Sequence, residues 1–212
     1  MKHILILLLV CTVITTNLVF AEDVNDIVKK VQKTYDKIDN FSATFKQIET
    51  FKITGSKSET VGKIFVSGGE KYRFESEDQT IATDGKTVWT YNTQSKQLLI
   101  DNVREDSGVL LPRDLLFKYP KTYFATLLSQ DDSGKHKIYE IRLDPKENVY
   151  GYIKSIKLWI EDKTWLVQKI ETTDLNGNTS LFEISDQNTK AKIDPEIYKL
   201  KPHADTEVVD MR

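Results

Sequence analysis

Few residues of this chain have the types and spacing that catalysis requires. The sequence contains three histidines and one cysteine, Cys11. His136 and His203 lie in polar, loop-like stretches, and the chain has no Gly-x-Ser-x-Gly nucleophile motif, phosphate-binding glycine loop or His-Glu-x-x-His motif. Acidic residues are scattered among lysines, so no carboxylate pair suited to glycoside hydrolysis stands out. Sequence order leaves open a Ser–His–acid arrangement, but we predict no catalytic residue, metal site or cofactor, and no enzyme.

The chain is notably rich in aromatic residues. They are Phe45, Phe65, Tyr72, Phe74, Trp89, Tyr91, Phe117, Tyr123, Phe124, Trp159, Trp165 and Phe182. For each one alone, an ordinary sheet core is the simpler interpretation. Several predicted strands, however, have apolar residues at both odd and even positions, as at Val88 and Trp89. A strand of a sheet with one face in water instead alternates apolar and polar residues. A helix layer on one side and an apolar ligand cavity on the other would bury both faces.

The apolar spacing predicts one helix followed by many strands. Val24, Ile27, Val31, Tyr35 and Ile38 recur at intervals of three and four, which is typical of an amphipathic helix. The period then changes to two, and the predicted strands are 41–46, 61–66, 71–75, 79–83, 86–92, 97–101, 137–143, 155–160, 165–172 and 178–185. They alternate with turn signals, so we expect an antiparallel sheet of successive hairpins.

Two dipeptides carry the strongest turn signals. Asp84-Gly85 and Asn176-Gly177 are flanked by alternating segments. This pattern favours a type I′ turn, in which both central residues have positive φ.

One segment, residues 109–129, interrupts the period of two. Its apolar residues predict short helices separated by Pro120, placed where they could cover the sheet. No linker composition or fixed repeat divides the chain, so we predict one domain over residues 22–212.

The N-terminus indicates export. Lys2 opens a basic start, residues 4–10 are uninterrupted apolar, and the apolar character continues to Phe20 before Ala21. This is the pattern of a signal peptide over residues 1–21. A retained anchor would need about 20 mostly apolar residues, and threonines and an asparagine interrupt this run. A lipid-modified Cys11 is disfavoured because bulky Val10 precedes it.

Charge and cysteine usage exclude other classes. The chain carries 30 Lys and Arg against 32 Asp and Glu, interspersed, with a formal net charge of −2. No basic patch indicates nucleic acid. Removal of the leader would also remove Cys11, leaving no disulfide, thiolate or cysteine metal ligand.

Several short motifs follow one another along the chain: Phe45-Lys46-Gln47, Gly62–Val66, Tyr72-Arg73-Phe74, Asp84–Tyr91, Gln97, Pro112 before Leu115-Leu116, Asp174–Asn178, Pro202, Asp205 and Val208-Val209. Together they resemble the periplasmic outer-membrane lipoprotein carrier proteins, the LolA family. The most specific is the Asp-Gly-Lys-x-x-Trp-x-Tyr hairpin, together with the Phe-x-Gln strand before it. The resemblance covers essentially all of residues 22–212.

The resemblance implies a fold and a function. The fold is mainly β with helices (α+β): an unclosed β-barrel of about eleven antiparallel strands, whose concave face is covered by a lid of short helices. The function is to shield the acyl chains of lipoproteins and to shuttle them through the periplasm. The implied partners are acylated lipoproteins, an inner-membrane lipoprotein-releasing transporter and an outer-membrane acceptor, served by a monomer without a cofactor.

The resemblance also implies site residues. The acyl-chain cavity would include Phe45, Phe65, Tyr72, Phe74, Trp89, Tyr91 and Leu99, and the lid would include Leu115, Leu116 and Phe117. Gly68-Gly69 stands where the family has Arg-Pro, whose arginine helps to hold the lid shut. Lys71 and Arg73 lie nearby, but period two places them on the strand face opposite Tyr72 and Phe74.

Two other functions remain open for this fold. One is a periplasmic regulator that senses lipids or lipoproteins. The other is a membrane-anchored acceptor, which would require an acylated N-terminal cysteine.

Overall fold

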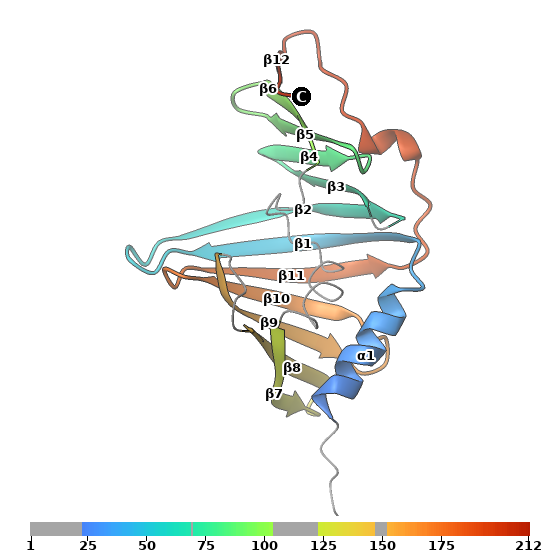
Figure 1. Cartoon of the computed structure of the whole chain (residues 1–212), viewed down its shortest axis with the longest axis vertical. Helices are drawn as coiled ribbons and strands as arrows, with labels where there is room; N and C mark the ends of the chain where they lie inside the picture. Colours follow the sequence, from blue (N-terminus) through green and yellow to red (C-terminus); the bar gives the residue numbers. More distant parts are fainter. Residues whose placement is uncertain (1–22, 69, 104–122, 147–151) are drawn as a thin grey trace, which may run out of the picture.

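The computed structural model describes residues 23–68, 70–103, 123–146 and 152–212 (Figure 1). Twelve strands form one sheet in the order β12-β6-β5-β4-β3-β2-β1-β11-β10-β9-β8-β7. Their bounds are β1 (Asn40–Thr50), β2 (Lys57–Ser67), β3 (Lys71–Ser76), β4 (Gln79–Thr83), β5 (Thr87–Asn92), β6 (Gln97–Asn102), β7 (Tyr123–Asp131), β8 (Ile138–Pro145), β9 (Ile153–Glu161), β10 (Val167–Asp174), β11 (Thr179–Asn188) and β12 (Glu207–Asp210). The predicted leader and the predicted lid residues Leu115, Leu116 and Phe117 lie outside the described residues.

The sheet consists of two meanders that meet at its centre. β1 to β6 pair in sequence order, β7 to β11 do the same, and β1 joins β11. All these pairs are antiparallel, whereas β12 runs parallel to β6 at one edge. The sheet remains unclosed, with β7 and β12 at its two edges, which confirms the predicted mainly β fold class. Within the described ranges no helix has the length and apolar character to cross a bilayer.

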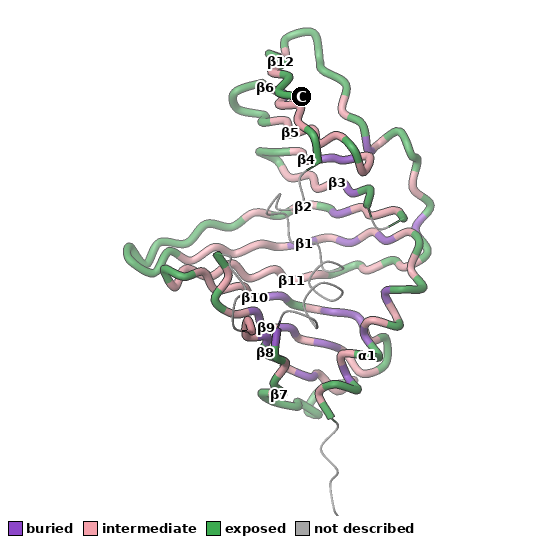
Figure 2. The backbone as a smooth tube through the Cα atoms, viewed as in Figure 1, coloured by how far each residue is buried: buried purple, intermediate pink, exposed green. Residues whose placement is uncertain are grey.

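Most predicted strands are confirmed to within a few residues. Alternation located them because apolar residues of neighbouring strands converge on shared clusters. Figure 2 shows that on β1, β2, β3 and β10 this burial lies toward the end of the strands that is nearer α1, while the hairpin ends of β1–β2 and β10–β11 are exposed.

The helical prediction for residues 123–129 is wrong. These residues form the start of β7, which pairs antiparallel with β8. Tyr123 is buried, and Ala125 and Leu127 pack on the same core, while Phe124 and Leu128 are exposed. The apolar residues recur at three and four positions, so the spacing also fitted a helix. Pairing with β8 decides between the two.

The type I′ assignment of the two turns is also wrong, although both hairpins are present. Only the glycine of each pair has positive φ, +92° at Gly85 and +83° at Gly177. Each turn is longer than two residues and is held by an aspartate. Asp84 accepts hydrogen bonds from the Lys86 and Thr87 amides, and Asp174 accepts one from the Asn178 amide. Carboxylate acceptors of this kind stabilise longer loops.

Helix α1 (Val24–Tyr35) packs on one half of the sheet. Asp23 caps its N-terminus by accepting a hydrogen bond from the Asn25 amide. Ile27, Val31 and Tyr35 are buried against side chains of β7 to β10. The helix ends three residues before the predicted limit at Ile38, which packs at the border of the two apolar clusters. The face of the sheet that carries α1 is called the inner face below.

The buried Tyr35 hydroxyl makes stability depend on pH. Its oxygen accepts a hydrogen bond of 3.2 Å from the Val167 amide, and burial raises the pKa of Tyr35 to about 12 from 10.0. The unfolded chain therefore loses this proton first as the pH rises, and the free energy of unfolding falls from pH 10 to about pH 12.

We expect Tyr35→Phe to lack this alkaline loss, which amounts to up to about 3 kcal/mol. At neutral pH the variant should be less stable than the wild type by about 1 to 3 kcal/mol, because the Val167 amide loses its partner. Urea unfolding near neutrality and near pH 11 measures both effects. The same pH dependence in both proteins would contradict the assignment.

Candidate binding pocket on the inner face

The strand register decides which side chains share the inner face. Residues paired directly across antiparallel strands point to the same side of a sheet. Ile64 pairs with Phe74, and Phe74 pairs with Ile81, so these three form one inner row across β2, β3 and β4. The neighbouring row, Phe65 with Arg73 and Ala82, points to the opposite face, called the outer face below.

An aromatic cluster forms the centre of the inner face. The Phe45 ring meets the Phe74 ring edge-on at 5.7 Å between centroids, and the Phe182 ring at 6.1 Å. Tyr72 meets Phe74 edge-on at 5.9 Å. These are favourable arrangements of aromatic quadrupoles. They join β1, β3 and β11, so they hold the two meanders together.

Gly62 makes this arrangement of Phe45 sterically feasible. It is the direct partner of Phe45 on β2, and a Cβ atom there would lie 2.7 Å from Phe45 Cζ. The same Cβ would also collide with the carbonyl oxygen of Glu75 on β3. The absent side chain lets the ring lie flat over the strand and lets β3 approach closely.

A pocket of about 520 Å³ opens beside this cluster. This volume lies within the range of small-molecule and lipid sites, roughly 300 to 1,000 Å³. Its apolar wall consists of Phe41, Phe45, Ile64, Phe74, Ile81, Ile170, Phe182 and Ile184. Its polar lining consists of Gln47, Glu49, Thr60, Glu75, Ser76, Asp78, Gln79, Thr172 and Ser180.

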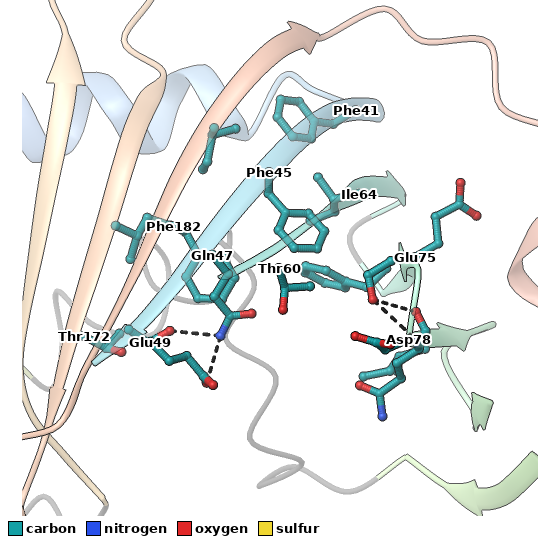
Figure 3. A pocket seen from close by; sticks show the side chains of 17 residues that line it. Phe41, Phe45, Gln47, Glu49, Thr60, Ile64, Glu75, Asp78, Thr172 and Phe182 are labelled. Carbon is teal, nitrogen blue, oxygen red and sulfur yellow. Dashed lines mark hydrogen bonds between the residues drawn. The ribbon is translucent and has the colours of Figure 1, made fainter. Parts of the chain in front are cut away.

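Polar and apolar lining residues lie at different ends of the pocket. Along β1, Phe41 and Phe45 come first, and Gln47 and Glu49 lie nearer the β1–β2 turn. Ser180 lies at the corresponding end of β11, opposite Glu49. Figure 3 shows Gln47 and Glu49 on one side of the pocket and Asp78 on the other. The pocket therefore has an apolar interior and a polar rim.

Hydrogen bonds fix the rim on the β1 side. The Gln47 amide nitrogen donates to Glu49 Oε1 at 3.1 Å and to Ser180 Oγ at 3.0 Å. The Ser58 hydroxyl donates to the other carboxylate oxygen of Glu49 at 3.3 Å. The side chain of Glu75 turns away from the pocket, because its carboxylate pairs with Arg73 on the outer face at 2.7 Å.

Of the seven predicted cavity residues, Phe45 and Phe74 line the pocket. Tyr72 and Leu99 share the inner face but not the pocket lining, and Tyr72 is buried in the aromatic cluster. The register places Phe65, Trp89 and Tyr91 on the outer face, in the rows of Arg73 and Glu75. Their assignment as acyl-chain residues stays a prediction.

The outer-face aromatics lie where the C-terminal segment covers the sheet. The 3₁₀ helix η1 (Pro195–Tyr198) contacts β3 and β4, and Arg73 Nη1 donates to the Ile197 carbonyl at 3.0 Å. Tyr198 is fully buried and bonds to the Ser67 hydroxyl, and the Tyr91 ring meets His203 edge-on. These strands are thus apolar on both faces because this segment covers one of them. Arg73 acts on the outer face, as the sequence predicts.

Several lining residues were not predicted from the sequence. Gln47 and Glu49 have the same parity as Phe45, so alternation along β1 could have found them. Phe182 and Ile184 belong to a strand distant in sequence, and their place beside Phe45 follows from the β1–β11 pairing. No local sequence pattern predicts that pairing.

The arrangement suits binding of an amphiphile. Apolar chains would lie along the phenylalanine and isoleucine wall, while a polar head would meet amide, hydroxyl and carboxylate groups at the rim. Among the described residues no group of three or more His, Cys, Asp or Glu side chains is arranged to hold a metal ion.

Comparisons with known proteins agree with this architecture. The model of the family described as outer membrane lipoprotein carrier protein LolA matches residues 36–201. An outer-membrane lipoprotein carrier protein of Shewanella sp. (strain MR-7) is 25% identical over 221 residues, covering 100% of this chain and 98% of that protein. One from Pectobacterium carotovorum subsp. carotovorum (strain PC1) is 21% identical over 176 residues, covering 78% and 79%.

Solved structures share the fold. An uncharacterised conserved protein of Thermus thermophilus superposes with a TM-score of 0.58 at 13% identity, over 88% of this chain and 98% of that one. MucB superposes with a TM-score of 0.51 at 18% identity, over 90% and 66%. With a family model that spans most of the chain, the protein belongs to the LolA family of outer membrane lipoprotein carrier proteins.

Proposed function

We propose that this protein is a periplasmic carrier that shields the acyl chains of lipoproteins and shuttles them from the inner to the outer membrane. The observation that carries the proposal is the pocket on the inner face, with its apolar wall around Phe45, Phe74 and Phe182 and its polar rim. Each methylene moved from an apolar site into water costs about 0.8 kcal/mol, so long acyl chains need such a wall to cross an aqueous compartment.

The proposal includes a working cycle. Residues 22–212 would act as one carrier domain after removal of the leader at Ala21. The chain would take cargo from an inner-membrane lipoprotein-releasing transporter and deliver it to an outer-membrane acceptor, as a monomer and without chemistry on the cargo. Leu115, Leu116 and Phe117 would belong to a lid over the pocket. Family membership and the names of full-length relatives support this cycle.

A regulator that senses lipids or lipoproteins is the second candidate. The likeness to MucB is at 18% identity and concerns the fold. The relative from Shewanella sp. (strain MR-7), named as a carrier, aligns over 98% of its own length. We therefore favour the carrier.

Ligand binding tests the proposal directly. We expect the purified chain to bind a lipid-mimicking fluorophore, and a triacylated peptide to displace it. The unacylated peptide, with the same sequence, is the control and should displace little, because the apolar wall would recognise the acyl chains. Mass spectrometry of protein purified from its native envelope should identify acylated species. Equal displacement by both peptides would contradict a carrier role.

A further inference from the structure

Large apolar side chains are exposed together at one end of the sheet. Ile53 is 92% exposed and Phe51 44%, both in the turn between β1 and β2. Leu175, in the turn between β10 and β11, is 67% exposed, and Tyr152, before β9, is 88% exposed. These four residues are called the apolar tip. Figure 1 shows the β1–β2 hairpin projecting beyond the rest of the sheet, with the β10–β11 hairpin beside it.

Hydrogen bonds hold the parts of the apolar tip together. The Lys52 amide donates to Asn178 Oδ1 at 3.0 Å, which ties the two turns. The Leu175 amide donates to the Tyr152 carbonyl at 3.0 Å. Gly177 lies close under the Lys52 stem, since a Cβ atom there would be 2.7 Å from Lys52 Cδ. The exposed side chains therefore form one surface on a fixed backbone.

Cations surround this surface. Lys52, Lys57 and Lys154 are exposed beside it. Of the neighbouring carboxylates, Glu59 pairs with Lys46 at 2.8 Å, whereas Asp174 and Glu49 are bonded by neutral donors and keep their charge. Three lysines against two carboxylates leave a net positive charge beside the apolar tip. An apolar apex with lysines at its base is complementary to a bilayer whose headgroups carry negative charge.

The pocket rim faces the same end of the molecule. β1 ends there and β11 begins there. The rim residues Glu49 and Ser180 each lie within two residues of those strand ends, whereas Ser76 lies further back, where it pairs with Gly62 inside β2. A membrane that receives the apolar tip would therefore lie next to the polar rim.

We propose that the apolar tip inserts into the headgroup region of an anionic bilayer, which places the pocket rim against the membrane surface. This inference deepens the proposed carrier function and rests on it. Transfer of side chains as exposed as Ile53 and Tyr152 from water into the bilayer lowers their free energy, and approach to anionic lipid lowers the electrostatic energy of the lysines beside them. Contact with the bilayer would shorten the aqueous path of an acyl chain between membrane and pocket.

Vesicle co-sedimentation of the mature chain tests the inference. We expect wild type to sediment with vesicles that contain phosphatidylglycerol and to bind pure phosphatidylcholine vesicles more weakly. Ile53→Ser should weaken partitioning by about tenfold or more, and Lys57→Gln should weaken it at low salt. Met211→Ser is the matched control, since Met211 is 50% exposed and follows the edge strand β12, where its amide bonds to the Ile100 carbonyl, away from the apolar tip. It should bind vesicles as the wild type does.

The same variants separate docking from cargo binding. Ile53→Ser should still bind triacylated peptide in solution, because Ile53 does not line the pocket. Two results would overturn the membrane assignment and leave the carrier function standing. One is that the wild type does not bind vesicles, and the other is that Ile53→Ser and Met211→Ser lose vesicle binding equally. Loss of peptide binding in Ile53→Ser would overturn it too, because the tip would then belong to the pocket. Failure of wild type to bind peptide, with vesicle binding intact, would contradict the carrier function alone.

Discussion

Phe182→Glu is expected to weaken binding of a triacylated peptide by at least about 100-fold while the protein stays folded. Phe182 lines the pocket and is half-buried, so a carboxylate there could reach water in the empty protein. Acyl chains that enter the pocket would have to desolvate this charge, close to the existing carboxylate of Glu49. Most of the cost therefore falls on binding, while loss of the contact with the Phe45 ring should cost about 2 kcal/mol of stability and lower the Tm by roughly 4 to 8 °C.

Val61→Glu is the matched control for this variant. Val61 is exposed on the outer face and lies directly opposite Lys46, so the same new charge there meets a cation. This variant should bind peptide as the wild type does. Fluorophore displacement and thermal melting of both variants give the comparison. Unchanged peptide binding by folded Phe182→Glu would remove the pocket from the proposed function.

Gly62→Ala is expected to lower the free energy of unfolding by about 3 kcal/mol or more. The added Cβ would meet the Phe45 ring at 2.7 and 2.8 Å and would also collide with the Glu75 carbonyl oxygen. The ring could turn aside, but the carbonyl belongs to the backbone of the neighbouring strand, so β2 and β3 would have to separate. A fall in Tm of roughly 6 to 12 °C should accompany this change.

Gly134→Ala separates this collision from a general effect of losing glycine. The nearest atom to a Cβ at residue 134 is the His136 carbonyl oxygen at 3.6 Å, an ordinary contact. We expect this variant to remain within about 0.5 kcal/mol of the wild type. Urea unfolding of the three proteins tests the pair. Equal stability of Gly62→Ala and wild type would show that β3 does not approach Gly62 as closely as described.

Tyr72 shows that a residue can lie on the same face of the sheet as the pocket without lining the pocket. Period two correctly placed Tyr72 and Phe74 on the face opposite Lys71 and Arg73. Phe74 lines the pocket, whereas Tyr72 is buried in the aromatic cluster, where its ring meets Phe74 edge-on. A charge at residue 72 would therefore act on folding as well as on binding.

The sequence alone determined the class of fold and the positions of most strands. Alternation is a local property, so it located β3 and β4 without knowledge of their partners. Asp-Gly and Asn-Gly correctly predicted two hairpins, although both turns are longer than two residues and are held by hydrogen bonds to an aspartate carboxylate. The ordered motifs from Phe45 to Val209 predicted the family, which the family model confirms.

The tertiary structure decided which apolar face meets the pocket. Val88 and Trp89 are adjacent and both apolar. Alternation therefore places their side chains on opposite faces of the sheet but does not show which of them points inward. Pairing through Ala82 to Arg73 places Trp89 on the outer face, where the C-terminal segment packs. In the same way, Phe182 reaches Phe45 only through the β1–β11 pairing of distant segments. Register between strands is a long-range property, because it arises when packed side chains of separate segments bury each other's surface.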